Sequence, residues 1–314
     1  MSKPQKLSFA ILGTGALGGL YGALLARDGQ DVHFLVRSDY EQVRSTGLKI
    51  ESPIADFEIP VQAHASVDSM PQVDVAIVAW KTTANSYLKT ALAKILKPEG
   101  AVLVLQNGLN VEADSAAVVG AENVLGGCCF LCSNKVGPGH IHHLDYGAIV
   151  FGEYAESRAG KVTPRMERLT EVFRSAEIDM TPSENLALVR WKKLVWNIPF
   201  NGMSVVLGAS TDKIIKNPAT RKLAEDLMWD VVHSAKACGT EINSSHVEKM
   251  LDATAKMVPY DSSMFLDYKA KRPIEVESIF GNPLRAALAV DFRPAKIEML
   301  YHQLCYLDQA NRDF

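Results

Sequence analysis

The stretch that decides the fold is LSFAILGTGALG, from Leu7 to Gly18. Its apolar first half predicts a buried strand, and three glycines follow at the GxGxxG spacing of a dinucleotide-binding turn. Gly13 permits a tight turn, Gly15 lets the backbone approach a pyrophosphate, and Gly18 lets the next helix pack closely on the strand. The free N–H groups at the start of that helix would bind the phosphates. The alternative is a strand–turn–helix that binds no ligand. The candidate cofactor-binding residues of this turn are Gly13, Thr14, Gly15, Ala16, Leu17 and Gly18.

The next predicted strand distinguishes between the two nicotinamide dinucleotides. It runs from Asp31 to Val36 and is followed by Arg37, where an NAD-binding turn usually carries an acidic residue for the ribose 2′-hydroxyl. A guanidinium suits a 2′-phosphate, so the sequence favours NADP(H). Two alternatives stay open: Arg37 as an ordinary loop arginine, and Asp39 as a ribose ligand placed two residues late.

Strands and helices alternate from residue 7 to about residue 120, which predicts a doubly wound, Rossmann-type α/β sheet. The elements expected after Arg37 are a helix over Asp39–Thr46, a hairpin of Leu48–Glu51 and Phe57–Val61, a strand over Val73–Trp80, a helix over Ala84–Leu96 and a strand over Ala101–Leu105. Ligands of such sheets bind at the carboxyl ends of the strands. We therefore expect one crevice lined by Gly13, Arg37, Lys81 and Asn107. Taken alone, Lys81 is equally an ordinary surface lysine.

The pattern changes at Val124, where alternating residues and a Gly-Pro-Gly turn predict antiparallel strands that finish the sheet. A helix is expected from Pro164 to Ala176. Beyond the Thr181–Glu184 stretch no convincing strand pattern appears. We therefore expect a nucleotide-binding domain over residues 1–182 and an all-helical domain over residues 183–314.

The first long helix of the second half, Asn185–Val206, carries a polar stripe beside its apolar face. Lys193, Asn197 and Asn201 are spaced at i, i+4 and i+8, which stacks them along one side of the helix. One cation with two amides is suited to a polar substrate, whereas the alternative is a solvated polar edge. Lys192 is out of register with the two asparagines, so Lys193 is the better candidate.

Two later features are less specific. Ser262 and Ser263 lie in a turn that leads into a short helix, and Arg272–Glu275 is expected to open another helix. Glu275 would then lie in the first turn, where the helix dipole favours an ionised carboxylate.

Composition excludes several function classes. With 47% hydrophobic and 22% charged residues and a net charge of −3, the chain has no field that would gather nucleic acid or an anionic membrane. No apolar run approaches the roughly 18 to 20 residues of a membrane span, and the apolar start is interpreted as a strand rather than a signal peptide. Five cysteines fit a reducing compartment, hence a cytoplasmic protein. Cys128, Cys129 and Cys132 match no zinc spacing, so no metal is expected.

Taken together, these pieces resemble the ketopantoate reductase family (2-dehydropantoate 2-reductases). The match runs over nearly the whole chain. It comprises GTGALG (Gly13–Gly18), Arg37, Lys81, QNG (Gln106–Gly108), WKKLVWNIPFN (Trp191–Asn201) and SSMFLDYKAKRPIEVE (Ser262–Glu277).

The resemblance implies NADPH-dependent reduction of a small-molecule 2-oxo acid, ketopantoate, in pantothenate and coenzyme A synthesis. It makes Lys193 the general acid and Glu275 its assistant, which also contacts substrate and is counted with the cofactor-binding residues. It implies that Asn107, Asn197, Asn201 and Ser263 bind substrate, and that Arg37, Lys81 and Asn107 serve the cofactor. We further expect Lys193 and Glu275 to oppose one another across the cleft.

The chain departs from the family at two places, because members often carry an asparagine where Phe280 stands and another near Thr211, and both are replaced here. These changes bear on which 2-oxo acid is reduced, so a paralogue for another small 2-oxo acid is an alternative. A non-catalytic NADP(H) sensor is a second alternative, although a sensor has no need of Lys193 and Glu275. The sequence does not determine the oligomeric state, and a homodimer is compatible with it.

Overall fold

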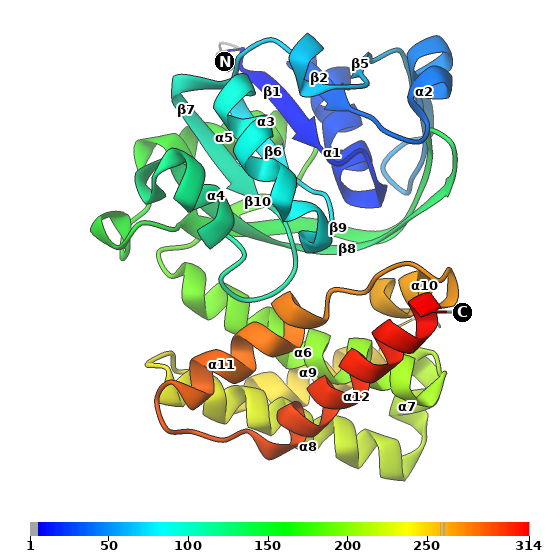
Figure 1. Ribbon diagram of the computed structural model, residues 1–314, viewed down its shortest axis with the longest axis vertical. Coiled ribbons are helices and arrows are strands. Elements are labelled where there is room, and N and C mark those ends of the chain that lie inside the picture. Colours follow the sequence, from blue (N-terminus) through cyan, green and yellow to red (C-terminus); the bar gives the residue numbers. More distant parts are fainter. Residues whose placement is uncertain (1–5, 258, 260, 314) are drawn as a thin grey trace. The chain divides into compact units, whose positions relative to one another are not determined.

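The apolar run before the glycine turn forms a buried strand inside a ten-stranded sheet, with two further strands between it and one edge (Figure 1). The computed structural model describes residues 6–257, 259 and 261–313. The chain forms two compact units: Met1–Gln106 with Val111–Leu186, and Asn107–Asn110 with Ala187–Phe314. The expected domain boundary after residue 182 stays a prediction.

The sheet is mixed, with strand order β4-β3-β9-β8-β7-β6-β1-β2-β5 and β10 beside β9. Its strands are β1 (Ser8–Leu12), β2 (Asp31–Leu35), β3 (Leu48–Glu51), β4 (Phe57–Ile59), β5 (Gln62–His64), β6 (Val73–Val78), β7 (Leu96–Val104), β8 (Val124–Gly137), β9 (His140–Glu153) and β10 (Met180–Pro182). Strands β2, β1, β6, β7 and β8 are parallel neighbours, and β8 with β9 and β3 with β4 are antiparallel. The carboxyl ends of β6, β1 and β2 therefore meet at one edge.

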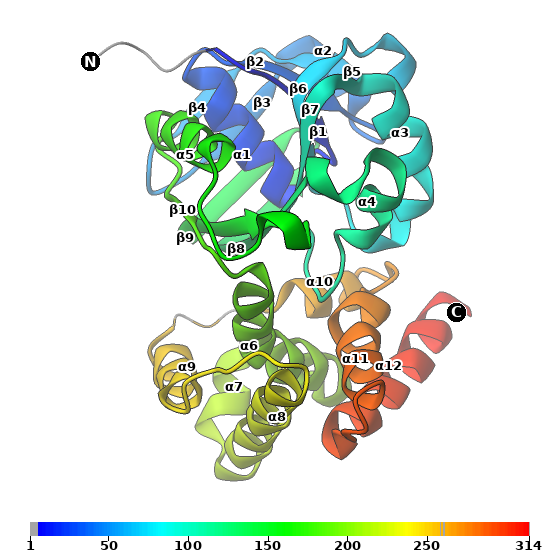
Figure 2. The ribbon, with the colours of Figure 1, turned by 90° about the vertical axis from the view of Figure 1, so that its left-hand side faces the viewer.

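Helices cover both faces of this sheet (Figure 2). The α-helices of this unit are α1 (Ala16–Arg27), α2 (Tyr40–Thr46), α3 (Leu88–Ile95), α4 (Ala113–Val119) and α5 (Pro164–Ser175). On one face α1 and α5 pack against Phe9 and Ile11, and the ring of Phe173 lies 6.1 Å from that of Phe9, edge to face. On the other face α3 packs against Ala10 and Leu12. Successive residues of β1 are thus buried on opposite sides, which confirms the doubly wound fold.

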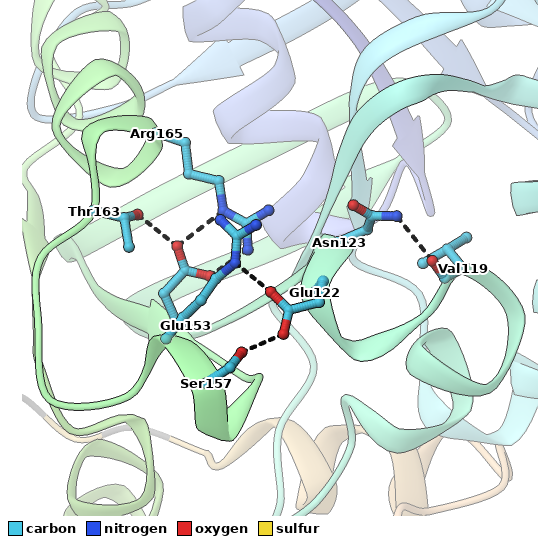
Figure 3. Close-up of polar contacts among 8 residues, drawn as sticks. Val119, Glu122, Asn123, Glu153, Ser157, Thr163 and Arg165 are labelled. Carbon is cyan, nitrogen blue, oxygen red and sulfur yellow. Dashed lines mark hydrogen bonds and ion pairs between the residues drawn. The ribbon is translucent and has the colours of Figure 1, made fainter.

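Hydrogen bonds between side chains link the carboxyl end of β9 to the segment that follows it (Figure 3). The buried Glu153 carboxylate accepts a hydrogen bond from Thr163 Oγ1 at 2.5 Å and is held by Arg165 through two nitrogens. Thr163 directly precedes α5, so these bonds fix where that helix begins. Nearby, Asn123 Nδ2 donates to the carbonyl of Val119 at 2.9 Å.

The second unit is helical, and no strand follows Pro182 among the described residues, which confirms the expected all-helical second half. Its elements are α6 (Leu186–Leu207), α7 (Thr211–Lys216), α8 (Pro218–Ala237), α9 (Ser245–Lys256), α10 (Ser263–Lys269), a π-helical turn η5 (Glu277–Gly281), α11 (Asn282–Leu288) and α12 (Ala295–Asp313). A separate core joins α6 to α8, α11 and α12. Within the described residues, no helix combines the length and apolarity that a membrane crossing requires.

Several expected boundaries were wrong. Residues 82–87 form a 3₁₀ helix, η2 (Thr82–Tyr87), before α3 begins at Leu88, because Asn85 is held by Trp80 and Gln106. Strand β7 begins at Leu96 instead of residue 101, with a register shift opposite β6. That irregularity accommodates Pro98, which has no N–H to donate.

The antiparallel pair β8 and β9 does not finish the sheet as expected. β9 also pairs with β3 and with β10, so the β3–β4 hairpin extends the sheet beyond it. The local sequence could not predict this pairing, because β3 and β9 lie about ninety residues apart and meet only through the tertiary fold.

Candidate active site

The glycine turn of the first unit has the geometry that its sequence predicts. Gly13 has φ +110°, and a Cβ there would lie 2.4 Å from the backbone nitrogen of Trp80. A Cβ on Gly18 would lie 2.2 Å from the Gly13 carbonyl oxygen. Both positions therefore exclude any side chain, because backbone cannot move aside as a flexible side chain can. Thr14 ties the turn to β2 by donating to the Leu35 carbonyl at 3.0 Å.

Gly15 differs from its two neighbours because a Cβ there would meet nothing within 4 Å. It is the N-cap of α1, with extended backbone (φ −94°, ψ −161°) and no side chain that could accept from the first N–H groups, and no acidic residue lies in the first turn. The first N–H groups of a helix have no partner within it and carry partial positive charge. An open approach to these groups fits a pyrophosphate, as the sequence predicts.

At the end of β2, exposed Arg37 lies beside a hollow of about 580 Å³ that reaches from the start of α2 to Ala65 and Pro138. The second candidate there, Asp39, is buried and already bonded to the protein. Its carboxylate accepts from Ser38 Oγ at 2.7 Å and from the Gly139 N–H at 3.0 Å, and it pairs with Lys135.

The charge state of Asp39 follows from these contacts. Burial alone would raise the pKa of Asp39, but the hydrogen bonds from Lys135, Ser38 and Gly139 outweigh it and lower that pKa. The carboxylate is therefore engaged in holding α2 to the β8–β9 hairpin. This engagement disfavours Asp39 as a ribose ligand and leaves Arg37 as the candidate.

Lys81 is the N-cap residue of the 3₁₀ helix η2 and lies three residues after the end of β6. Its neighbour Trp80 donates its backbone N–H to the Leu12 carbonyl at 2.9 Å and packs against Gly13. The structure thus places Gly13, Lys81 and Arg37 after three adjacent parallel strands, as expected. Buried Gln106 links the ends of β6 and β7, because its Nε2 donates to the Trp80 carbonyl at 3.0 Å.

Asn107 belongs to the second compact unit of the chain. It begins the short segment Asn107–Asn110, which packs with the helical unit. Gly108 has φ +117°, and Leu109 donates its N–H to the Ser278 carbonyl at 2.9 Å. No sequence pattern indicates this packing, and the expectation that Asn107 joins the other three in one crevice stays a prediction.

In the helical unit, α6 carries Lys193, Asn197 and Asn201. Asn197 is only 5% exposed and Asn201 only 3%, while Lys193 is half-buried. These values exclude a solvated polar edge. Burying two amides in a helical core is unfavourable unless they meet polar partners, so the stripe is a polar surface built inside an apolar unit.

Glu275 lies immediately before the helical turn rather than within its first turn, so that expectation was wrong. Its carbonyl accepts from Ile279 N–H at 3.3 Å, and Val276 caps η5. The residue is 5% exposed, so its carboxylate belongs to the interior of the unit. Ser263 begins α10, whose cap is Ser262, which accepts from the Phe265 N–H at 3.2 Å. The expected opposition of Lys193 and Glu275 stays a prediction.

The two departures from the family pattern lie inside the helical unit, where Phe280 is 0% and Thr211 1% exposed. The cysteines of β8, Cys128, Cys129 and Cys132, are buried and form no disulfide bond. Over residues 6–257, 259 and 261–313, no three His, Cys, Asp or Glu side chains gather in a way that could hold a metal ion.

Comparison with known proteins gives matches along both units. Family models described as "Ketopantoate reductase PanE/ApbA" and its C-terminal counterpart match residues 9–156 and 185–306. A 2-dehydropantoate 2-reductase of Nostoc sp. is 52% identical over 97% of this chain and 96% of its own. The crystal structure of a 2-dehydropantoate 2-reductase from Geobacter metallireducens is 39% identical and covers 96% of this chain and 99% of its own, with a TM-score of 0.92. A D-mandelate dehydrogenase, solved with NADH and anilino(oxo)acetate, shares the fold at 18% identity (TM-score 0.87; 97% of this chain and 99% of its own).

Proposed function

The chain belongs to the ketopantoate reductase family, and on that premise we propose that it reduces 2-dehydropantoate to pantoate with NADPH, in the cytoplasmic synthesis of pantothenate and coenzyme A. The observation that carries this proposal is the 52% identity to a 2-dehydropantoate 2-reductase over 97% of the chain. The stripe of half-buried Lys193 and buried Asn197 and Asn201 supports it, because it supplies a cation and two amides where a plain helical core needs none.

Binding of the cofactor is assigned to the first unit. The open N-terminus of α1 at Gly15 would hold the pyrophosphate, Arg37 the 2′-phosphate, and Lys81 a further part of the dinucleotide. When bound, NADPH supplies the hydride that reduces the C2 carbonyl. Asn107 is assigned to the region of the reacting centre, where it would contact both cofactor and substrate.

The proton is assigned to Lys193. Reduction of a carbonyl carbon leaves negative charge on its oxygen, and a positioned ammonium stabilises that charge and then donates a proton to it. Glu275, a buried carboxylate, would hold the ammonium in its charged form. Asn197, Asn201 and Ser263 would bind the carboxylate and hydroxyl groups of the substrate through hydrogen bonds.

The direct test is NADPH oxidation, followed by absorbance, with ketopantoate against a panel of other 2-oxo acids. The proposal expects the largest kcat/KM for ketopantoate. A larger value for another 2-oxo acid would identify a paralogue, an outcome that the fold admits because a D-mandelate dehydrogenase shares it. NADPH binding without turnover of any 2-oxo acid would identify a sensor. A homodimer stays a prediction.

Replacing Arg37 with alanine tests the choice of cofactor. We expect the preference for NADPH over NADH, measured as a ratio of kcat/KM values, to fall about 10- to 100-fold, because a hydrogen bond to a charged group contributes about 1.5–3 kcal/mol. The matched control is Arg44→Ala on α2, an exposed arginine that pairs with Glu41 at 3.0 Å. If the Arg37 and Arg44 variants kept the same preference, the 2′-phosphate would have to bind elsewhere.

A further inference from the structure

The segment that carries Asn107 is bound to one helical turn of the second unit. The N–H of Leu109 donates to the Ser278 carbonyl at 2.9 Å, and Asn282 Nδ2 donates to the Leu109 carbonyl at 2.7 Å. Ser278 and Asn282 are four residues apart on the continuous helix formed by η5 and α11. Both backbone groups of Leu109 are therefore held by one side of that helix.

The π-helical turn explains why the Ser278 carbonyl can accept this bond. In a regular α-helix that carbonyl would accept from the N–H of Asn282. Here the Asn282 N–H instead donates to the Glu277 carbonyl. The next residue, Pro283, has no N–H to offer. The backbone hydrogen-bond pattern of the helix therefore allows the Ser278 carbonyl to accept from a donor outside the helix. Such π-helical turns are frequent at functional sites.

Gly108 allows the segment to come this close. A Cβ on Gly108 would lie 2.3 Å from the Ser278 carbonyl oxygen and 2.6 Å from its carbon, and φ is +117°. The contact is between two backbones, so no rearrangement of a flexible side chain could relieve it. Asn107 is the residue directly before this contact.

We propose that Ser278 and Asn282 are positioning residues, which hold Asn107 fixed to the unit that carries Lys193 and Glu275. The proposal rests on the proposed function, in which Asn107 contacts the reacting groups. In this arrangement the amide of Asn107 and the proton donor belong to one compact body. Placement errors of about 1 Å can reduce a rate by about 100-fold, so a fixed Asn107 has a direct effect on turnover.

The test uses Asn282→Asp in the full chain. Aspartate keeps the shape of asparagine and an oxygen for Arg285, which now bonds Asn282 Oδ1 at 2.7 Å, but it cannot donate to the Leu109 carbonyl. We expect kcat to fall about 10- to 100-fold with a smaller change in the dissociation constant of NADPH. The matched control is Asn123→Ala, which removes the same kind of amide-to-carbonyl bond, at 2.9 Å, from the first unit (Figure 3).

A double-mutant cycle separates positioning from general stability. If Asn282 acts through Asn107, then Asn282→Asp adds little to the loss already caused by Asn107→Ala. Full additivity, or an unchanged kcat in Asn282→Asp, would overturn the proposal.

Hydrogen exchange tests whether Asn282 holds the Leu109 segment, without any assay of activity. In Asn282→Asp the Leu109 amide is expected to exchange at least threefold faster, whereas the Leu105 amide, bonded to the Val78 carbonyl at 2.9 Å, keeps its rate. If the exchange were faster but the protein reduced no 2-oxo acid, the proposed function would be wrong, while the role of Asn282 in holding Leu109 would be supported. An unchanged exchange rate of the Leu109 amide would show that Asn282 does not hold this segment in place.

Discussion

Replacing Lys193 with methionine is expected to lower kcat for ketopantoate about 10²- to 10⁴-fold, the usual contribution of a positioned general acid. Methionine keeps the length and apolar stem of the side chain, so the half-buried position on α6 stays filled. The dissociation constant of NADPH should change less than about threefold, because cofactor binding is assigned to other residues. Steady-state kinetics and a fluorescence titration with NADPH measure the two quantities.

The matched control is Lys192→Met, one residue earlier on the same helix. Lys192 is also half-buried, and its backbone carbonyl accepts from His246 Nε2 at 3.2 Å, a bond that the variant keeps. We expect this variant to retain kcat within about threefold. Equal losses in the two variants, with lowered melting temperatures in both, would show that α6 needs the lysines for stability. A Lys193→Met enzyme with more than a tenth of the wild-type kcat would remove Lys193 from the role of general acid.

The parts of the fold that were predictable are those fixed by short-range constraints. Gly13 and Gly18 have fixed spacing after a strand, and in the structure each leaves no room for a Cβ against neighbouring backbone. The polar stripe on α6 was also visible, because helical periodicity alone places Lys193, Asn197 and Asn201 on one side. Periodicity could not say whether that side faces solvent, since the answer depends on helices that pack against it from later in the chain.

The parts that were missed depend on contacts between distant segments. Asp39 was weighed as a ribose ligand because nothing near it in sequence reveals Lys135 and Gly139, which occupy its carboxylate. The hydrogen bond from Leu109 to Ser278 was likewise not predictable, because it depends on the altered backbone hydrogen bonds of a π-helical turn 169 residues later. The Asn282–Pro283 pair gives weak evidence for it, since a proline inside a helix removes one N–H donor from the helix's backbone hydrogen bonds.

Replacing Gly15 with alanine is expected to weaken NADPH binding about 100-fold while leaving the free protein folded. The backbone of Gly15 suits any residue, at φ −94° and ψ −161°, and its Cβ would meet no atom within 4 Å. The cap of α1 loses at most about 1 kcal/mol, and reduced freedom of the unfolded chain offsets about 0.4–1 kcal/mol of it. The new methyl group would, however, fill the space through which the backbone approaches the pyrophosphate, and overpacking of this kind costs about 1–3 kcal/mol.

Gly13→Ala is the contrasting variant, since its Cβ would lie 2.4 Å from the Trp80 nitrogen at φ +110°. It should lower the melting temperature of the free protein, whereas Gly15→Ala should leave it within about 3 °C of wild type. Isothermal titration with NADPH and thermal melting without it distinguish the two effects, because only a ligand contact can weaken binding in a protein of unchanged stability. If Gly15→Ala bound NADPH as tightly as wild type, the pyrophosphate could not lie at the start of α1, and the cofactor assignment for this turn would be wrong.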